Sequence, residues 1–116
     1  MVLPASSASR PSPAHPTPAN VTAKRLGKAE KEPGQWMTYG GNYSEQRFSP
    51  LTKINAANVK NLSLSWLYDL PAPGTIKATP LQVGGALYFT TPNHVYAVDA
   101  RTGRELWHFT FARSRG

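Results

Sequence analysis

The last third of the chain, residues 78–107, constrains the fold more than any other part of the sequence. Four short apolar segments alternate there with three groups of residues that favour tight turns. The segments predict strands at Ala78–Val83, Ala86–Thr91, His94–Asp99 and Glu105–Phe109. The turns are expected at Gly84-Gly85, Pro92-Asn93 and Ala100–Gly103, where glycine can adopt positive φ. Short strands joined by such tight turns predict an all-β fold, built as a four-stranded antiparallel meander.

A four-stranded meander of roughly 40 residues is the repeat unit, or blade, of a β-propeller. A single blade has two apolar faces and cannot bury both of them by itself. The sequence predicts one blade only, and nine residues follow Trp107. We therefore expect either a piece of a larger protein, completed by the remaining blades, or a chain that pairs with other chains. Self-association through open strand edges is one form of the second alternative.

Composition divides the chain near residue 34. Residues 1–34 are rich in Pro, Ser and Ala and contain hardly any large apolar side chains, so we expect a disordered tail. This basic tail holds five Lys or Arg and two Glu, whereas residues 35–116 hold eight basic and four acidic residues. The net charge of +7 is therefore spread along the chain, which argues against a nucleic-acid-binding patch. No apolar stretch has the length of a membrane span, and the first residues do not resemble a secretory signal.

The rest of the chain, 35–116, is expected to form the partial propeller, with a lead-in segment at 35–70 and the first blade at about 76–110. Within the lead-in, Leu62–Tyr68 alternates between apolar and polar residues and predicts an extra N-terminal strand. A short helical turn is expected after Asn55, which can act as its N-cap.

The strongest local pattern lies at the turn between the third and fourth predicted strands. Asp99 and Thr102 can hydrogen-bond backbone groups and fix the turn, and Gly103 permits its geometry. Trp107 has a large flat surface suited to packing between neighbouring blades. All of these roles are structural, so the pattern predicts a blade and no catalytic residue.

Histidine and cysteine usage predicts no metal site. The chain has no cysteine, which excludes a disulfide or a thiolate ligand within it. Of the three histidines, His15 lies in the tail, while His94 and His108 lie on different predicted strands. No two of them have the spacing of metal ligands on a helix, so a zinc or copper site is not expected.

Two segments resemble the quinoprotein dehydrogenases, the enzymes that use pyrroloquinoline quinone (PQQ). Ala97–Trp107 resembles the tryptophan-docking motif that recurs in their blades. Trp36–Leu62, which begins Trp-Met-Thr-Tyr-Gly-Gly-Asn, resembles their N-terminal lead-in and is the more specific of the two. With Ala78-Thr79-Pro80 included, the resemblance covers residues 36–110, nearly all of the part that we expect to fold.

The resemblance implies an eight-bladed propeller with PQQ near its axis, beside a Ca²⁺ or lanthanide ion. It implies oxidation of alcohols or sugars, with electrons passing to a cytochrome or to ubiquinone, and a periplasmic location. It also implies that the strand at Leu62–Tyr68 belongs to the last blade of the ring, not to the blade that follows it in sequence.

One candidate cofactor ligand lies in this chain. In many members of the family, the position two before the Thr of Ala-Thr-Pro is a glutamate that touches PQQ, and here it is Lys77. A lysine there can bond a quinone oxygen or a carboxylate of PQQ, or it can be an ordinary solvated residue. No residue matches a catalytic or metal-binding position of the family, so we expect the isolated chain to be inactive and to bind neither PQQ nor metal. A non-enzymatic propeller-repeat protein, acting as a scaffold or interaction module, is the alternative.

Overall fold

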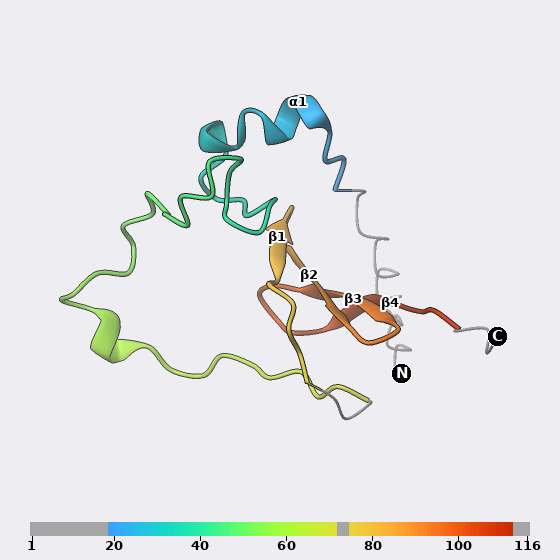
Figure 1. Cartoon of the computed structure of the whole chain (residues 1–116). Helices are drawn as coiled ribbons and strands as arrows, with labels where there is room; N and C mark the ends of the chain where they lie inside the picture. Colours follow the sequence, from blue (N-terminus) through green and yellow to red (C-terminus); the bar gives the residue numbers. More distant parts are fainter. Residues whose placement is uncertain (1–18, 72–74, 113–116) are drawn as a thin grey trace, which may run out of the picture.

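The computed structural model describes residues 19–71 and 75–112, and its centre is one four-stranded antiparallel sheet (Figure 1). The strands are β1 (Leu81–Val83), β2 (Ala86–Thr91), β3 (His94–Asp99) and β4 (Glu105–Thr110). They lie in the order β1-β2-β3-β4, with every neighbouring pair antiparallel. The predicted all-β meander is confirmed.

The turns between the strands follow from their residue types. Gly84 and Gly85 have φ values of 59° and 80°, the conformation that a two-residue hairpin turn requires and that glycine adopts at little cost. β2 and β3 have the predicted bounds, whereas β1 begins at Leu81 and not at Ala78. Pro80 accounts for the later start, because proline has no N–H to donate to the ladder.

Burial is concentrated in β3, which has a strand on each side. Tyr96, Ala97 and Val98 are at most 1% exposed. By contrast, β4 lies at the sheet edge, and its Trp107 and Phe109 side chains are 39% and 58% exposed. The central strand β3 is therefore buried, whereas the edge strand β4 is exposed.

Residues 19–34 differ from the expected disordered tail, whose residues 1–18 lie outside the described part. They contain the short helix α1 (Ala23–Leu26) and the 3-10 turn η1 (Ala29–Lys31). The guanidinium of Arg25 donates two 2.7 Å hydrogen bonds to the Glu32 carboxylate. Ala29 is buried against Met37 and Val83. The composition of residues 19–34 gives no information about these contacts, which is why it predicted disorder.

The lead-in joins the blade at the outer edge of β1. The backbone N–H of Trp36 donates to the carbonyl of Gln82 over 2.7 Å, and the N–H of Gln82 donates back over 3.0 Å. The first edge of the sheet is therefore partly paired, unlike the edge of β4.

The prediction of an extra strand at Leu62–Tyr68 is wrong, because the structure has no strand there. Leu62 and Leu64 are 60% and 78% exposed. A strand needs a hydrogen-bonded neighbour, and the described residues offer none to this segment. The helical turn is also displaced, since the 3-10 turn η2 spans Val59–Asn61 and follows Asn55, whose side chain accepts from the N–H of Ala57. Figure 1 shows this green-to-yellow part of the chain following a wide path to the side of the sheet.

Candidate cofactor-binding site

An open groove of about 560 Å³ contains the candidate ligand Lys77. The groove lies where the chain enters β1 and leaves β2, and its lining residues are Thr75, Lys77, Ala78, Thr90, Thr91 and Pro92. Leu81 pairs with Tyr88 in the β1–β2 ladder, so continuing this register backward from β1 brings Lys77 level with Pro92. The lining of the groove agrees with this register, since it includes both Lys77 and Pro92.

The lining of this groove suits an anionic group. Lys77 is exposed, and no carboxylate is among the lining residues. Within the described part of the chain, Arg25 forms an ion pair with Glu32, and no carboxylate lies within ion-pair distance of the Lys77 ammonium. Three threonines add hydroxyl groups that can donate hydrogen bonds to an anion.

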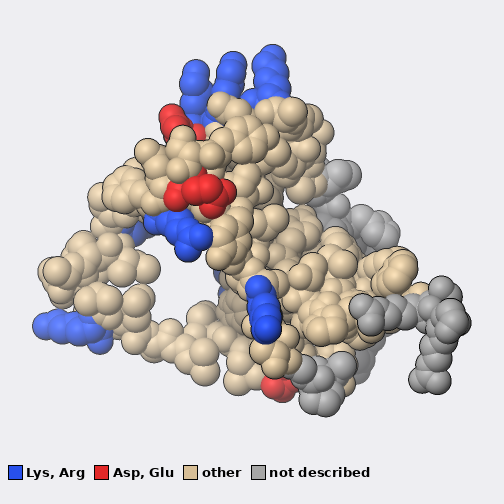
Figure 2. Space-filling model, in the orientation of Figure 1, with Lys and Arg blue, Asp and Glu red and all other residues tan. Residues whose placement is uncertain are grey.

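Basic side chains on the face drawn in Figure 2 include a group at the top of the view. Figure 2 shows Lys and Arg at several separated places on the visible face. This distribution agrees with the spread of charge in the sequence.

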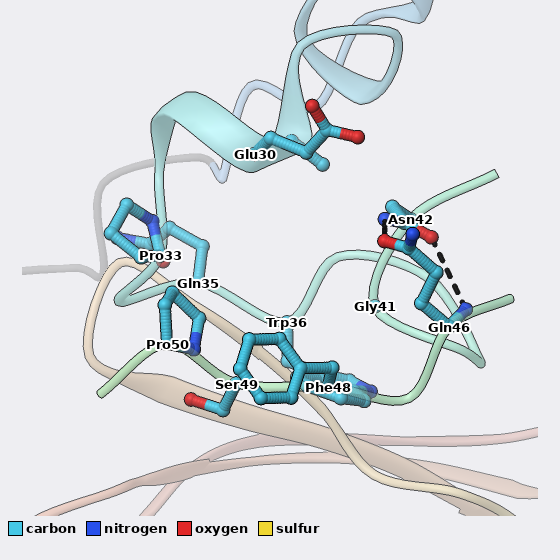
Figure 3. A pocket seen from close by; sticks show the side chains of 11 residues that line it. Glu30, Pro33, Gln35, Trp36, Gly41, Asn42, Gln46, Phe48, Ser49 and Pro50 are labelled. Atoms are coloured by element: carbon cyan, nitrogen blue, oxygen red, sulfur yellow. Dashed lines mark hydrogen bonds between the residues drawn. The ribbon is translucent and has the colours of Figure 1, made fainter. Parts of the chain in front are cut away.

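A second pocket of about 230 Å³ lies between residues 29–33 and the lead-in segment (Figure 3). The rings of Trp36 and Phe48 form its apolar wall, and the carboxylate of Glu30 lies at its far side. The amide of Asn42 donates to the side-chain oxygen of Gln46 over 2.6 Å and holds the loop that closes it. With one carboxylate and no second titratable group in its lining, this pocket has no acid–base pair.

The turn after β3 forms a docking surface for a tryptophan. One oxygen of Asp99 accepts from the backbone N–H groups of Arg101 and Thr102 and from the Thr102 hydroxyl, at 2.9–3.0 Å. These bonds confirm the roles predicted for Asp99 and Thr102. They also lower the pKa of the Asp99 carboxyl, chiefly through the two bonds from Thr102.

The tryptophan that lies on this turn is Trp66 of the lead-in. Its indole N–H donates to the carbonyl of Ala100 over 3.1 Å. Its ring packs so closely on Gly103 that a Cβ added there would lie 2.5 Å from the ring. Trp107, in contrast, lies beside Tyr88 with ring centroids 6.1 Å apart. The turn-and-tryptophan arrangement therefore joins the lead-in to the first blade.

Residues 36–115, more than half of the chain, match the sequence model of the β-propeller domain of PQQ-dependent glucose, ethanol and alcohol dehydrogenases. The chain belongs to this family. The quinohemoprotein alcohol dehydrogenase ADH-IIG of Pseudomonas putida is 48% identical over 103 residues, which are 88% of this chain and 14% of that protein. The dehydrogenase subunit of an alcohol dehydrogenase (quinone) of Komagataeibacter europaeus is 47% identical over 77% of this chain and 12% of its own length.

Solved structures of the family have the same fold. The structure of ADHIIG from Pseudomonas putida HK5 aligns with a TM-score of 0.76 and 48% identity, over 80% of this chain and 14% of that one. A europium-containing methanol dehydrogenase aligns with a TM-score of 0.69 and 38% identity, over 78% of this chain and 16% of its own. The chain thus spans about one eighth to one seventh of the length of the curated relatives it matches. Its relatives are bacterial proteins, and no helix in the described part is long and apolar enough to cross a bilayer.

One group of side chains was missed by the sequence analysis. His94 and His108 lie on neighbouring strands, with His94 Nδ1 3.2 Å from His108 Nε2. Their separation of fourteen residues has no meaning on a helix, but the β3–β4 register places them diagonally across the hairpin. The predicted strands and the turn between them imply this register, so the proximity of the two histidines could have been inferred from the sequence. His15 lies outside the described residues.

Proposed function

We propose that this chain supplies the lead-in and first propeller blade of a PQQ-dependent dehydrogenase that oxidises alcohols. The observation that carries the proposal is the family match over residues 36–115, in which the blade and the docked lead-in occur together. Relatives named alcohol dehydrogenases favour alcohols, with sugars as the second substrate class of the family. A quinone as electron acceptor is supported by the name of the Komagataeibacter europaeus relative, and a cytochrome by that of a further relative, the 1-butanol dehydrogenase (cytochrome c) of Thauera butanivorans. A periplasmic location agrees with the family.

Within this proposal, Lys77 binds an anionic edge of the cofactor. PQQ carries carboxylates and quinone oxygens, and the Lys77 groove offers an ammonium without a competing carboxylate. The chemistry that PQQ supplies when bound is the two-electron oxidation of the substrate. The contribution of this chain is limited to holding and orienting the cofactor, since the groove contains no carboxylate that could act as a base.

The metal ion of the family is held by other parts of the whole protein in this proposal. Among the described residues, no group of three or more His, Cys, Asp and Glu side chains converges as a metal site. Accordingly, we expect the isolated 116-residue chain to show no dye reduction with alcohols or sugars when PQQ and Ca²⁺ are added. Turnover above background would contradict this assignment.

The role of Lys77 is tested in the protein expressed from its whole gene. We expect Lys77→Ala to weaken PQQ binding, measured by cofactor titration, by about tenfold or more, the effect of removing a charged hydrogen bond of 1.5–3 kcal/mol. Lys60→Ala, at the exposed turn η2, is the matched control and should leave binding unchanged. Equal affinity of the Lys77→Ala protein would show that Lys77 is a solvated residue. If the unsubstituted protein binds no PQQ, the scaffold alternative is favoured.

A further inference from the structure

Three polar atoms converge on one face of the β3–β4 hairpin. His94 Nδ1 and His108 Nε2 are 3.2 Å apart. The hydroxyl of Thr110 is 3.2 Å from the first and 3.0 Å from the second. The three atoms form a nearly equilateral triangle, and the cross-strand pair His94–Thr110 and the neighbouring residue His108 place them there.

The dimensions of this triangle match those of ligands around a transition-metal ion. Imidazole nitrogens bind zinc at about 2.0–2.1 Å, so two of them at a tetrahedral angle lie about 3.3 Å apart. At most one proton can lie between the two ring nitrogens, so at least one nitrogen presents a lone pair. Imidazole is a favoured ligand of zinc, copper and nickel.

The ring of Tyr96 stacks on both imidazole rings and restrains them. Tyr96, which is fully buried, stacks on His108 with centroids 4.8 Å apart and an interplanar angle of 18°. It also stacks on His94 at 5.9 Å and 28°. A site whose ligands are already oriented loses less entropy on binding.

A carboxylate stands behind one of the two rings. Glu105 Oε1 is 3.9 Å from His108 Nδ1, the nitrogen that faces away from the triangle. The other oxygen of Glu105 accepts a hydrogen bond from the Tyr68 hydroxyl, which restrains the carboxylate. Metal-ligating histidines commonly direct their second nitrogen toward such a carboxylate, which raises their basicity. The His108 side chain is 29% exposed, so ions from solvent can reach it.

We propose that His94 and His108, with the Thr110 hydroxyl as third ligand, form a binding site for a divalent transition-metal ion such as Zn²⁺ or Cu²⁺. Water completes the coordination on the open side, and Glu105 is a positioning residue. The site shares no residue with the lining of the Lys77 groove, although His94 pairs with Thr91, which lines that groove. The proposal does not depend on the proposed function.

The test uses the untagged 116-residue chain and the metal alone. Calorimetric titration with ZnCl₂ should show one saturable site per chain. Cu²⁺ bound to the same chain should show hyperfine coupling to two imidazole nitrogens in its electron paramagnetic resonance spectrum. We expect His94→Ala and His108→Ala each to weaken Zn²⁺ binding by at least about tenfold, and Glu105→Gln to weaken it by about tenfold through His108.

His15→Ala is the matched control, because it removes one histidine elsewhere in the sequence and should leave Zn²⁺ affinity unchanged. Amide NMR spectra without metal establish that each variant is folded, and His94→Gln replaces His94→Ala if the alanine variant is not. Absence of a saturable Zn²⁺ site would overturn the proposal. So would affinity that survives both histidine substitutions, or a loss caused equally by His15→Ala.

Discussion

Tyr96 is fully buried, and its hydroxyl has no hydrogen-bond partner among the described residues. Its ring stacks on Phe89 and on His108, with centroid distances of 5.2 Å and 4.8 Å, so Tyr96 stabilises the blade through its aromatic ring. A buried hydroxyl without a partner costs about 1–3 kcal/mol of desolvation. We expect Tyr96→Phe to raise the free energy of unfolding in urea by about 1 kcal/mol. A loss of stability would instead show that the hydroxyl is bonded in solution.

Tyr68 carries the largest pKa shift among the described residues, to about 12. Burial of the phenol is the main cause, and the Glu105 carboxylate that accepts its hydrogen bond adds to it. Since the folded pKa exceeds the ordinary value of about 10, the neutral phenol stabilises the fold fully below pH 10. This contribution is lost as the pH rises from 10 to about 12.

Tyr68→Phe should therefore remove part of the alkaline loss of stability. Between pH 9 and pH 11 the free energy of unfolding falls in both proteins. We expect this fall to be about 1 kcal/mol smaller in Tyr68→Phe than in the unsubstituted chain, after allowance for solvent screening. In parallel, ultraviolet titration of the folded chain should lose the tyrosine that ionises at a pH of about 12. An unchanged titration curve would contradict the assignment to Tyr68.

At the scale of elements, the lead-in is attached to the blade through Trp66 and Gly103. Gly103 and Gly84 have similar positive φ values, 72° and 59°, but different surroundings. A Cβ at Gly103 would meet the Trp66 ring at 2.5 Å, whereas a Cβ at Gly84 would meet nothing within 4 Å. Substitutions at the two glycines therefore distinguish the cost of backbone strain, which both share, from the cost of a clash with Trp66, which arises at Gly103 only.

We expect Gly84→Ala to destabilise the chain by about 1 kcal/mol, the cost of positive φ for alanine. Gly103→Ala should cost about 2–4 kcal/mol, because overpacking against Trp66 adds to the same strain. Chemical unfolding of both variants measures the difference. Adding Trp66→Ala should make the Gly103→Ala cost fall to that of Gly84→Ala, and additive effects would show that the docking contact is absent.

At the scale of the whole molecule, the two edges of the sheet are unequal. The β1 edge is partly paired through one bridge between Trp36 and Gln82, whereas no described residue bridges the outer edge of β4. Large apolar side chains accompany this edge: Trp107, Phe109 and Phe111 are 39%, 58% and 61% exposed. An edge strand with exposed apolar residues is a surface for pairing with another chain.

We therefore expect the isolated chain to associate at micromolar concentration through β4. Light scattering across a concentration series should show the average mass rising with concentration. Phe109→Lys should suppress this rise, because a charge on an edge strand opposes pairing. Leu64→Lys, at a residue that is 78% exposed in the lead-in, is the control and should have little effect. A monomer at every concentration would contradict the prediction.

The blade could be predicted because its determinants are local. Short apolar runs set β2 and β3, the glycines set the first turn, and Asp99 with Thr102 set the last one. The family resemblance followed from the lead-in at Trp36–Leu62 together with the blade, and the position of Lys77 followed from its place just before Ala78-Thr79-Pro80. Each strand and turn of the blade depends on residues only a few positions apart.

The remaining features depend on contacts between distant residues, which only the tertiary structure decided. Leu62–Tyr68 has the alternation of a strand but no neighbour to pair with among the described residues, and residues 19–34 are attached to the blade because Ala29 packs with Val83. His94 and His108 converge only once β3 and β4 are in register. A pattern along one strand specifies which face each side chain occupies, whereas the identity of its neighbours is determined when the strands pair.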